Sequence, residues 1–283
     1  MMRLVRSAAQ MQQIAVRLRR AGKSIGFVPT MGALHEGHVS LVRAARRAHD
    51  VVIASLFVNP LQFGPREDFR RYPRAFASDR RLLAKAGCDW LFAPDVEQIY
   101  PRGFATHVDV GPLGLLLEGA IRPGHFRGVA TVVCKLFQIV QPTAAYFGQK
   151  DYQQCAVIRR MIADLALPVR FRMMPIVREP DGLAMSSRNV YLTAAQRAQA
   201  VVLSRALRFA RARIRRGERS AAAIRALVRR DTATATLGRL DYVELVDVDT
   251  LQPLRRVKGR AAILLAVRFG ATRLIDNVLV EVP

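Results

Sequence analysis

Two histidines follow a short apolar run and a glycine-bearing turn near the start of the chain. His35 and His38 flank Gly37 within residues 29–38, directly after the apolar stretch 25–28. Side chains three residues apart lie over the same turn of a helix. Helix starts attract phosphate because their first N–H groups lack partners and the helix dipole is positive there. The pattern His-x-Gly-His after a strand is typical of nucleotidyl transfer and predicts a nucleotide phosphate site.

A second group of polar residues opens another helix after another apolar run. Gly148 gives room there, Lys150 supplies a point charge for phosphate, and Asp151 stands near the helix start. Gln154 lies four residues past Lys150, so both side chains can point into one cleft. Plain helix capping is the alternative interpretation of these charges.

Two further segments add polar groups. Gln62 follows the apolar run 51–58 and offers one acceptor and two donors, which suits hydroxyl and carboxylate groups. Residues 185–188 read Met-Ser-Ser-Arg, which joins two hydroxyls to a guanidinium fork in a turn-rich loop. This composition is expected of a lid that closes on phosphates. Neither segment is distinctive by itself. Each indicates a ligand site only because of where it lies in the predicted fold.

Alternating strand and helix patterns position these groups. In the first 177 residues, strands are predicted at 25–28, 51–58, 90–93, 144–147 and 169–177, and helices at 4–20, 39–49, 67–86, 129–140 and 152–165. This alternation predicts an α/β fold, a Rossmann-like doubly wound parallel sheet with helices on both faces. Ligands bind outside the carboxyl ends of such strands. The histidines, Gln62 and Lys150 all fall at those ends.

The pattern changes after residue 177. Helices are predicted at 194–216 and 220–236, followed by strands at 242–248, 261–268 and 274–281. We therefore expect a catalytic domain at 1–177 and a smaller α+β lid domain at 178–283.

Composition narrows the class of protein. The formal net charge is +23 over 283 residues, but the basic residues are almost all arginine, spread over both halves and not interleaved with aromatic side chains. Base-stacking platforms need that interleaving, so we expect no specific nucleic-acid partner. The three cysteines show no metal or disulfide spacing, and no apolar run is long enough to span a membrane. We expect a cytoplasmic protein without a membrane partner.

Taken together, the motifs resemble the pantothenate synthetase (pantoate–β-alanine ligase) family of His-x-Gly-His nucleotidyltransferases. The resemblance rests on segments that stand in the family's order and approximate spacing: 29–38 (PTMGALHEGH), 57–63 (FVNPLQF), 72–74 (YPR), 122–129 (RPGHFRGV), 147–154 (FGQKDYQQ) and 181–189 (DGLAMSSRN).

The resemblance implies roles for individual residues. His38, the implied proton donor, His35, Lys150 and Arg188 would be the catalytic residues. Gln62 and Gln154 would bind pantoate, and Gln62 would also contact β-alanine. ATP would be bound by Met31, Gly32, Ala33, Leu34, His35, Glu36, Gly37, His38, Gly148, Gln149, Lys150, Asp151, Val177, Met185, Ser186, Ser187 and Arg188.

The implied reaction is ATP-dependent condensation of pantoate with β-alanine through a pantoyl adenylate, in a homodimer that uses Mg²⁺. One departure concerns the metal. Similar enzymes have two adjacent acidic residues after the Tyr-Pro-Arg element, whereas here the pair is Ser78-Asp79. Asp79 is the candidate metal ligand, and Mg²⁺ held mainly by ATP phosphates and water is the alternative.

Two other classes of protein compete with this interpretation. Another His-x-Gly-His nucleotidyltransferase or adenylate-forming ligase would share the phosphate site, but a synthetase acting on tRNA needs more chain than follows the loop at 185–188. A nucleic-acid-binding protein that is not an enzyme would leave both histidines and Lys150 without a role.

Overall fold

The computed structural model describes residues 2–282 except Arg66 and Asp68. The chain forms two compact units. Residues 1–148 and 153–175 make the first unit, and residues 149–152 and 176–283 make the second.

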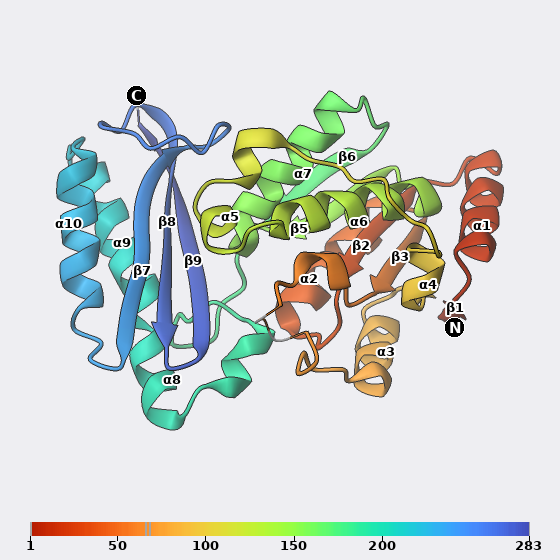
Figure 1. Ribbon diagram of the computed structural model, residues 1–283, viewed down its shortest axis with the longest axis horizontal. Helices are drawn as coiled ribbons and strands as arrows, with labels where there is room; N and C mark the ends of the chain where they lie inside the picture. The colour runs from red at the N-terminus through yellow and green to blue at the C-terminus, as the bar shows by residue number, and fades with distance from the viewer. Residues whose placement is uncertain (1, 66, 68, 283) are drawn as a thin grey trace. The chain divides into compact units, whose positions relative to one another are not determined.

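The first unit is built on a six-stranded parallel sheet (Figure 1), which confirms the predicted α/β class. Its order is β1 (Arg3–Val5), β4 (Trp90–Phe92), β3 (Val51–Leu56), β2 (Ile25–Thr30), β5 (Ala144–Gly148) and β6 (Arg170–Met174). From β2 the chain builds outward to β3 and β4, whereas β5 pairs with the other side of β2. The strand order therefore reverses between β2 and β5, and ligands bind at such switch points.

Helices cover both faces of this sheet. The helices are α1 (Ala8–Arg20), α2 (Glu36–Ala48), α3 (Phe76–Lys85), α4 (Val96–Ile99), α5 (Glu118–Ile121), α6 (His125–Val140) and α7 (Tyr152–Asp164). Adjacent residues of β2 point to opposite faces. Val28 packs in one core cluster with residues of α2, while the ring of Phe27 contacts Phe137 of α6.

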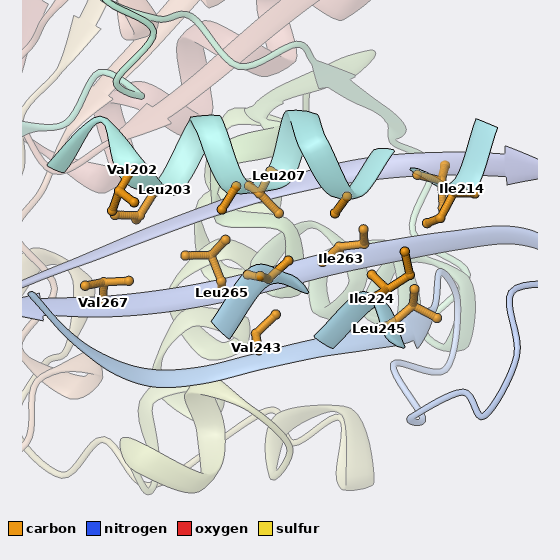
Figure 2. Packing of buried hydrophobic residues seen from close by; sticks show 14 of the residues in the cluster. Val202, Leu203, Leu207, Ile214, Ile224, Val243, Leu245, Ile263, Leu265 and Val267 are labelled. Atoms are coloured by element: carbon orange, nitrogen blue, oxygen red, sulfur yellow. The ribbon is translucent and has the colours of Figure 1, made fainter. Parts of the chain in front are cut away.

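The second unit is an antiparallel sheet of β7 (Gly238–Asp247), β8 (Gly259–Phe269) and β9 (Thr272–Val282), covered by helices. The helices are α8 (Ala194–Ala200), α9 (Val202–Arg215) and α10 (Ala221–Thr232). Figure 2 shows Leu203 and Leu207 of α9 in one apolar core with side chains of α10, β7 and β8. The predicted α+β character is confirmed.

Three predicted helices are wrong in part. Residues 4–5 belong to β1, because they pair with β4 and Ser7 caps α1. The helix predicted from residue 67 begins only at Phe76, since Pro73 cannot continue a helix and the preceding segment packs its aromatic rings on Phe63. Asp68, placed in that helix, lies outside the described residues. The single helix predicted at 194–216 is divided into α8 and α9.

Within the described residues, no helix is long and apolar enough to cross a membrane.

The contact between α6 and the turn at residues 60–62 depends on Gly128. A Cβ atom at Gly128 would lie 2.3 Å from the carbonyl oxygen of Leu61. Helix propensity alone would make the alanine variant more stable by about 1 kcal/mol. A clash with the backbone of this kind makes the substitution destabilising instead. We expect Gly128→Ala to lower the free energy of unfolding by at least about 2 kcal/mol in urea denaturation.

Gly114→Ala is the matched control, because its added Cβ would meet the nearest atom at 3.5 Å, an ordinary contact. Equal effects of the two substitutions would contradict the steric argument.

Candidate active site

The turn after β2 is held by a buried carboxylate. Gly32 and Ala33 both have positive φ, +91° and +52°, and alanine rarely adopts this conformation. The two carboxylate oxygens of Asp79, which is 2% exposed, accept hydrogen bonds from the N–H groups of Ala33 (2.9 Å) and Leu34 (2.8 Å). Asp79 thus stabilises the strained turn that delivers the two histidines.

The histidines cap the helix that they begin. The Nδ1 atom of His35 accepts a hydrogen bond from the N–H of Gly37 (3.2 Å), and Nδ1 of His38 accepts one from the N–H of His35 (3.4 Å). Their ring centroids are 4.2 Å apart. An Nδ1 atom that accepts carries no proton, so the neutral ring holds its proton on Nε2.

This geometry changes the expected phosphate site. The N–H groups of Ala33, Leu34 and Gly37 already have partners within the protein. These three backbone amides are therefore already satisfied and are not the groups that would meet phosphate here. Met31 lies at the start of the same segment, and Glu36 forms an ion pair with Arg43.

Gln62 lies at the end of a 3₁₀ turn, Pro60–Gln62, with its amide orientation defined by Asn59. The Nδ2 of Asn59 donates to Oε1 of Gln62 (3.1 Å), so the donor side of the amide is Nε2, which donates to Sδ of Met31 at 3.0 Å. Tyr100 donates its hydroxyl proton to Oδ1 of Asn59 at 2.8 Å, and burial raises the pKa of Tyr100, which keeps the phenol protonated. The orientation suits a substrate oxygen that accepts hydrogen bonds.

The backbone of Gln62 is braced by two residues that precede and open α6. His125 Nδ1 lies 2.8 Å from the Gln62 carbonyl oxygen, and Arg122 donates to the same oxygen at 3.3 Å. A carbonyl only accepts, so His125 donates from Nδ1. Burial, reinforced by the charge of Arg122, lowers the pKa of His125 to about 4, so the ring is neutral at pH 7. Arg122 also forms an ion pair with Glu67.

Adjacent glutamines at the start of α7 have different environments. Gln153 is buried, accepts a hydrogen bond from the N–H of Glu118 and donates to the carbonyls of Leu113 and Leu116. Gln154, the predicted pantoate contact, is only partly buried. Gln153 is therefore a structural residue, and Gln154 stays a prediction.

The turn that carries Lys150 (residues 149–152, the lysine turn) belongs to the second unit. Gly148 ends β5 with open space around its Cα, and residues 149–152, including Gln149, Lys150 and Asp151, cluster with the second unit. Residues 149–151 form the 3₁₀ turn η3 (Gln149–Asp151). The Lys150 side chain is 21% exposed, and its Nζ lies 3.5 Å from an oxygen of Asp151.

The predicted lid loop also lies in the second unit. The N–H of Met185 donates to the carbonyl of Val177 (3.0 Å), which places these two predicted ATP contacts side by side. Ser186 caps the turn η4 (Ser187–Tyr191) by accepting from the N–H of Arg188 (3.2 Å). Lys150 and the loop at 185–188 therefore share one compact unit, whereas both histidines and Gln62 lie in the other.

Among the described residues, no group of three or more His, Cys, Asp or Glu side chains is arranged to hold a metal ion. Asp79, the candidate ligand, is buried with both oxygens already accepting backbone N–H groups. It is poorly suited to coordinate a hydrated magnesium ion.

Sequence reasoning missed the residues that orient Gln62. Asn59 and His125 stood in the motif segments without an assigned role, and Tyr100 stood outside them. A tyrosine 41 residues from its partner leaves no local pattern.

The fold and the site define an α/β protein with polar groups at the carboxyl ends of parallel strands, where proteins of this class bind their ligands. The family model described as pantoate-beta-alanine ligase matches residues 3–279. The chain belongs to this family.

Individual relatives agree along their whole length. The pantothenate synthetase of Moorella thermoacetica is 56% identical over 281 residues, covering 99% of each chain. The crystal structure of pantothenate synthetase from Thermus thermophilus matches with a TM-score of 0.93 and 51% identity, covering 98% of this chain and 99% of that one. A pantoate-beta-alanine ligase from Francisella tularensis, solved with β-γ ATP and β-alanine, matches with a TM-score of 0.80 and 36% identity, covering 99% and 98%.

Asp79→Asn tests the anchoring of the histidine turn. Asparagine keeps one acceptor but turns an NH₂ group towards a backbone N–H. We expect a loss of about 2 kcal/mol in the free energy of unfolding and faster hydrogen exchange at the amides of Ala33 and Leu34. Exposed Asp95, given the same substitution, is the control. Unchanged exchange at both amides would refute the anchoring role.

The lowered pKa of His125 predicts that the stability of the protein depends on pH. Its pKa is lowered from 6.5 to about 4 in the folded protein, so between these values the unfolded chain binds more protons. The contribution of neutral His125 to the free energy of unfolding is complete above pH 6.5 and is lost as the pH falls towards 4. His125→Asn retains a donor for the Gln62 carbonyl but does not titrate. We expect the stability difference between wild type and variant to shrink by up to about 3 kcal/mol over this window. A difference independent of pH would contradict the prediction.

Proposed function

We propose that the protein condenses pantoate with β-alanine to form pantothenate, consuming ATP and releasing AMP and pyrophosphate. The observation that carries the proposal is the family match over residues 3–279, which contains both histidines, Gln62 and Lys150. The relative from Francisella tularensis, solved with β-γ ATP and β-alanine, supports the choice of two of the substrates.

The first step joins pantoate to AMP. A carboxylate oxygen of pantoate attacks the α-phosphorus of ATP, the bond from that phosphorus to the bridging oxygen breaks, and pyrophosphate leaves with the bond electrons. The carboxylate is already ionised, so the step needs in-line alignment and stabilisation of charge on pyrophosphate more than a base. The Nε2–H donors of His35 and His38 are suited to that charge.

Other residues bind and align the substrates in this proposal. Gln62 donates from Nε2 to a pantoate or β-alanine oxygen, and Gln154 assists with pantoate. Lys150 and Arg188 offset the charge of the phosphates, with the hydroxyls of Ser186 and Ser187 as further donors. Met31, Gly32, Ala33, Leu34, Glu36, Gly37, Gly148, Gln149, Asp151, Val177 and Met185 complete the ATP contacts.

In the second step the neutral amine of β-alanine attacks the acyl carbon of pantoyl adenylate. The bond from that carbon to the phosphate oxygen breaks, AMP leaves, and the nitrogen loses a proton as the amide forms. Water would hydrolyse the same anhydride, so the reaction requires an enclosed site. We propose that residues 1–177 provide the catalytic domain and that 178–283 act as a lid.

We propose that the reaction would use Mg²⁺ brought by the phosphates of ATP, where the ion would neutralise phosphate charge with water as most of its other ligands. The two amide hydrogen bonds of Asp79 argue against this carboxylate as a ligand. A cytoplasmic homodimer is the assembly and location that the family resemblance favours.

An AMP-release assay with purified protein tests the function. We expect AMP and pantothenate in equal amounts only when ATP, pantoate and β-alanine are all present. AMP release that does not require pantoate would favour another adenylate-forming enzyme. A nucleic-acid gel shift that survives moderate salt would favour the basic-surface alternative.

Two substitutions at His38 distinguish the role of its Nδ1 atom, which caps the helix, from the role of its Nε2–H donor. Asparagine offers an acceptor near the position of Nδ1 but no donor at Nε2, whereas glutamine carries an N–H near the position of Nε2. We expect His38→Asn to slow adenylation by about 10²–10³-fold and His38→Gln to retain more activity, measured by pantoate-dependent exchange of pyrophosphate into ATP. Exposed His107→Ala is the control. An active His38→Asn variant would contradict the role of Nε2.

A further inference from the structure

Two buried polar side chains stand next to each other in β9. Asp276 and Asn277 are each 2% exposed in a strand that also contributes Leu274 and Val280 to the apolar core. Buried polar groups are costly unless their hydrogen bonds are made. The partners of this pair lie in the two segments of the second unit that carry predicted phosphate contacts.

Asn277 holds the lysine turn through its whole amide group. Its Nδ2 donates to the carbonyl oxygens of Gln149 and Lys150, both at 2.9 Å, and its Oδ1 accepts from Nε2 of Gln149 at 3.1 Å. Two successive carbonyls bound by one nitrogen restrict the backbone on both sides of the Lys150 Cα. The direction from which the lysine side chain leaves the backbone is therefore set by β9.

Asp276 holds the segment that leads into the loop at 185–188. Arg178 donates to both carboxylate oxygens of Asp276, at 2.7 and 2.9 Å, and also to the carbonyl of Gly182 at 3.1 Å. Arg178 pairs with Ala184 in an isolated β-bridge. The ion pair therefore fixes the base of the turn immediately before Met185.

The pair is coupled within itself. Oδ1 of Asp276 accepts from the backbone N–H of Asn277 at 2.8 Å. We propose that Asp276 and Asn277 are positioning residues that place Lys150 and Arg188 on one scaffold for the phosphates of ATP. This inference rests on the proposed function, because it deepens the role of the same site. Lysine and arginine have long flexible stems, so a defined backbone origin reduces the freedom lost when they align on phosphate.

Asn277→Ala removes all of the side-chain bonds to the lysine turn. We expect pantoate-dependent exchange of pyrophosphate into ATP to slow by about 10- to 100-fold, with a higher KM for ATP and an unchanged KM for pantoate. Reaction of preformed pantoyl adenylate with β-alanine should stay within about twofold, since that step no longer involves pyrophosphate. Asn277→Ser, which keeps one donor, should show a smaller loss and serves if the alanine variant does not fold.

Thr232→Val is the control for stability. Thr232 is buried in the same unit and donates to backbone carbonyls of its own helix, at Val228 and Arg229. The substitution also removes a buried side-chain donor but touches neither phosphate segment. We expect a lower Tm with kinetic constants unchanged within about twofold.

A double-mutant cycle separates positioning from general support. If Asn277 acts through Lys150, then adding Asn277→Ala to Lys150→Ala should slow pyrophosphate exchange further by less than about twofold. A full 10- to 100-fold further loss, or equal losses in both half-reactions, would overturn the inference.

Failure of the proposed function has a different signature. Wild-type protein would then show no pantoate-dependent exchange at all. Calorimetric titration with ATP would still decide the positioning role. Asn277→Ala and Lys150→Ala should weaken ATP binding by similar factors, and the double variant should bind ATP no more weakly than either single variant. Unchanged ATP affinity in Asn277→Ala would overturn it.

Discussion

Backbone groups that leave a parallel strand lose their ladder partners, and the site depends on how they are satisfied. In this protein the turns after β2, β3 and β5 all receive side chains from distant parts of the chain. Asp79 accepts from the turn after β2, His125 donates to the turn after β3, and Asn277 donates to the turn after β5. Because buried N–H and C=O groups are expensive to leave without partners, these contacts determine the shapes of the turns.

A chemical consequence follows for the histidine segment. Asp79 accepts from the amides of Ala33 and Leu34 in the turn before α2, and the ring of His35 accepts from the amide of Gly37 in the first turn of that helix. The same contacts assign Nδ1 of both rings as acceptors and leave the proton on Nε2. In the proposed reaction the side chains of the two histidines, rather than these amides, would meet pyrophosphate, and each side chain can be replaced and tested singly.

Much of the fold was predictable because it is encoded by local periodicity. The alternating apolar runs predicted the parallel sheet, and the change of pattern after residue 177 predicted the α+β unit. The errors arose where tertiary packing competes with periodicity. Residues 4–5 look helical by spacing but pair with β4, and the segment after Glu67 is governed by Pro73 and an aromatic cluster.

The sequence by itself determined the chemical groups: both histidines, Gln62, Lys150 and the loop at 185–188, with the class of reaction that they suit. Those signals are readable because turns and helix caps act over three or four residues. Only the tertiary structure decided which groups hold them. Asp79 lies 45 and 46 residues from its amide partners, and Asn277 lies 127 and 128 residues from its carbonyl partners. Partners that far apart are brought together by strand order and core packing, which leave no mark in the local spacing of the chain.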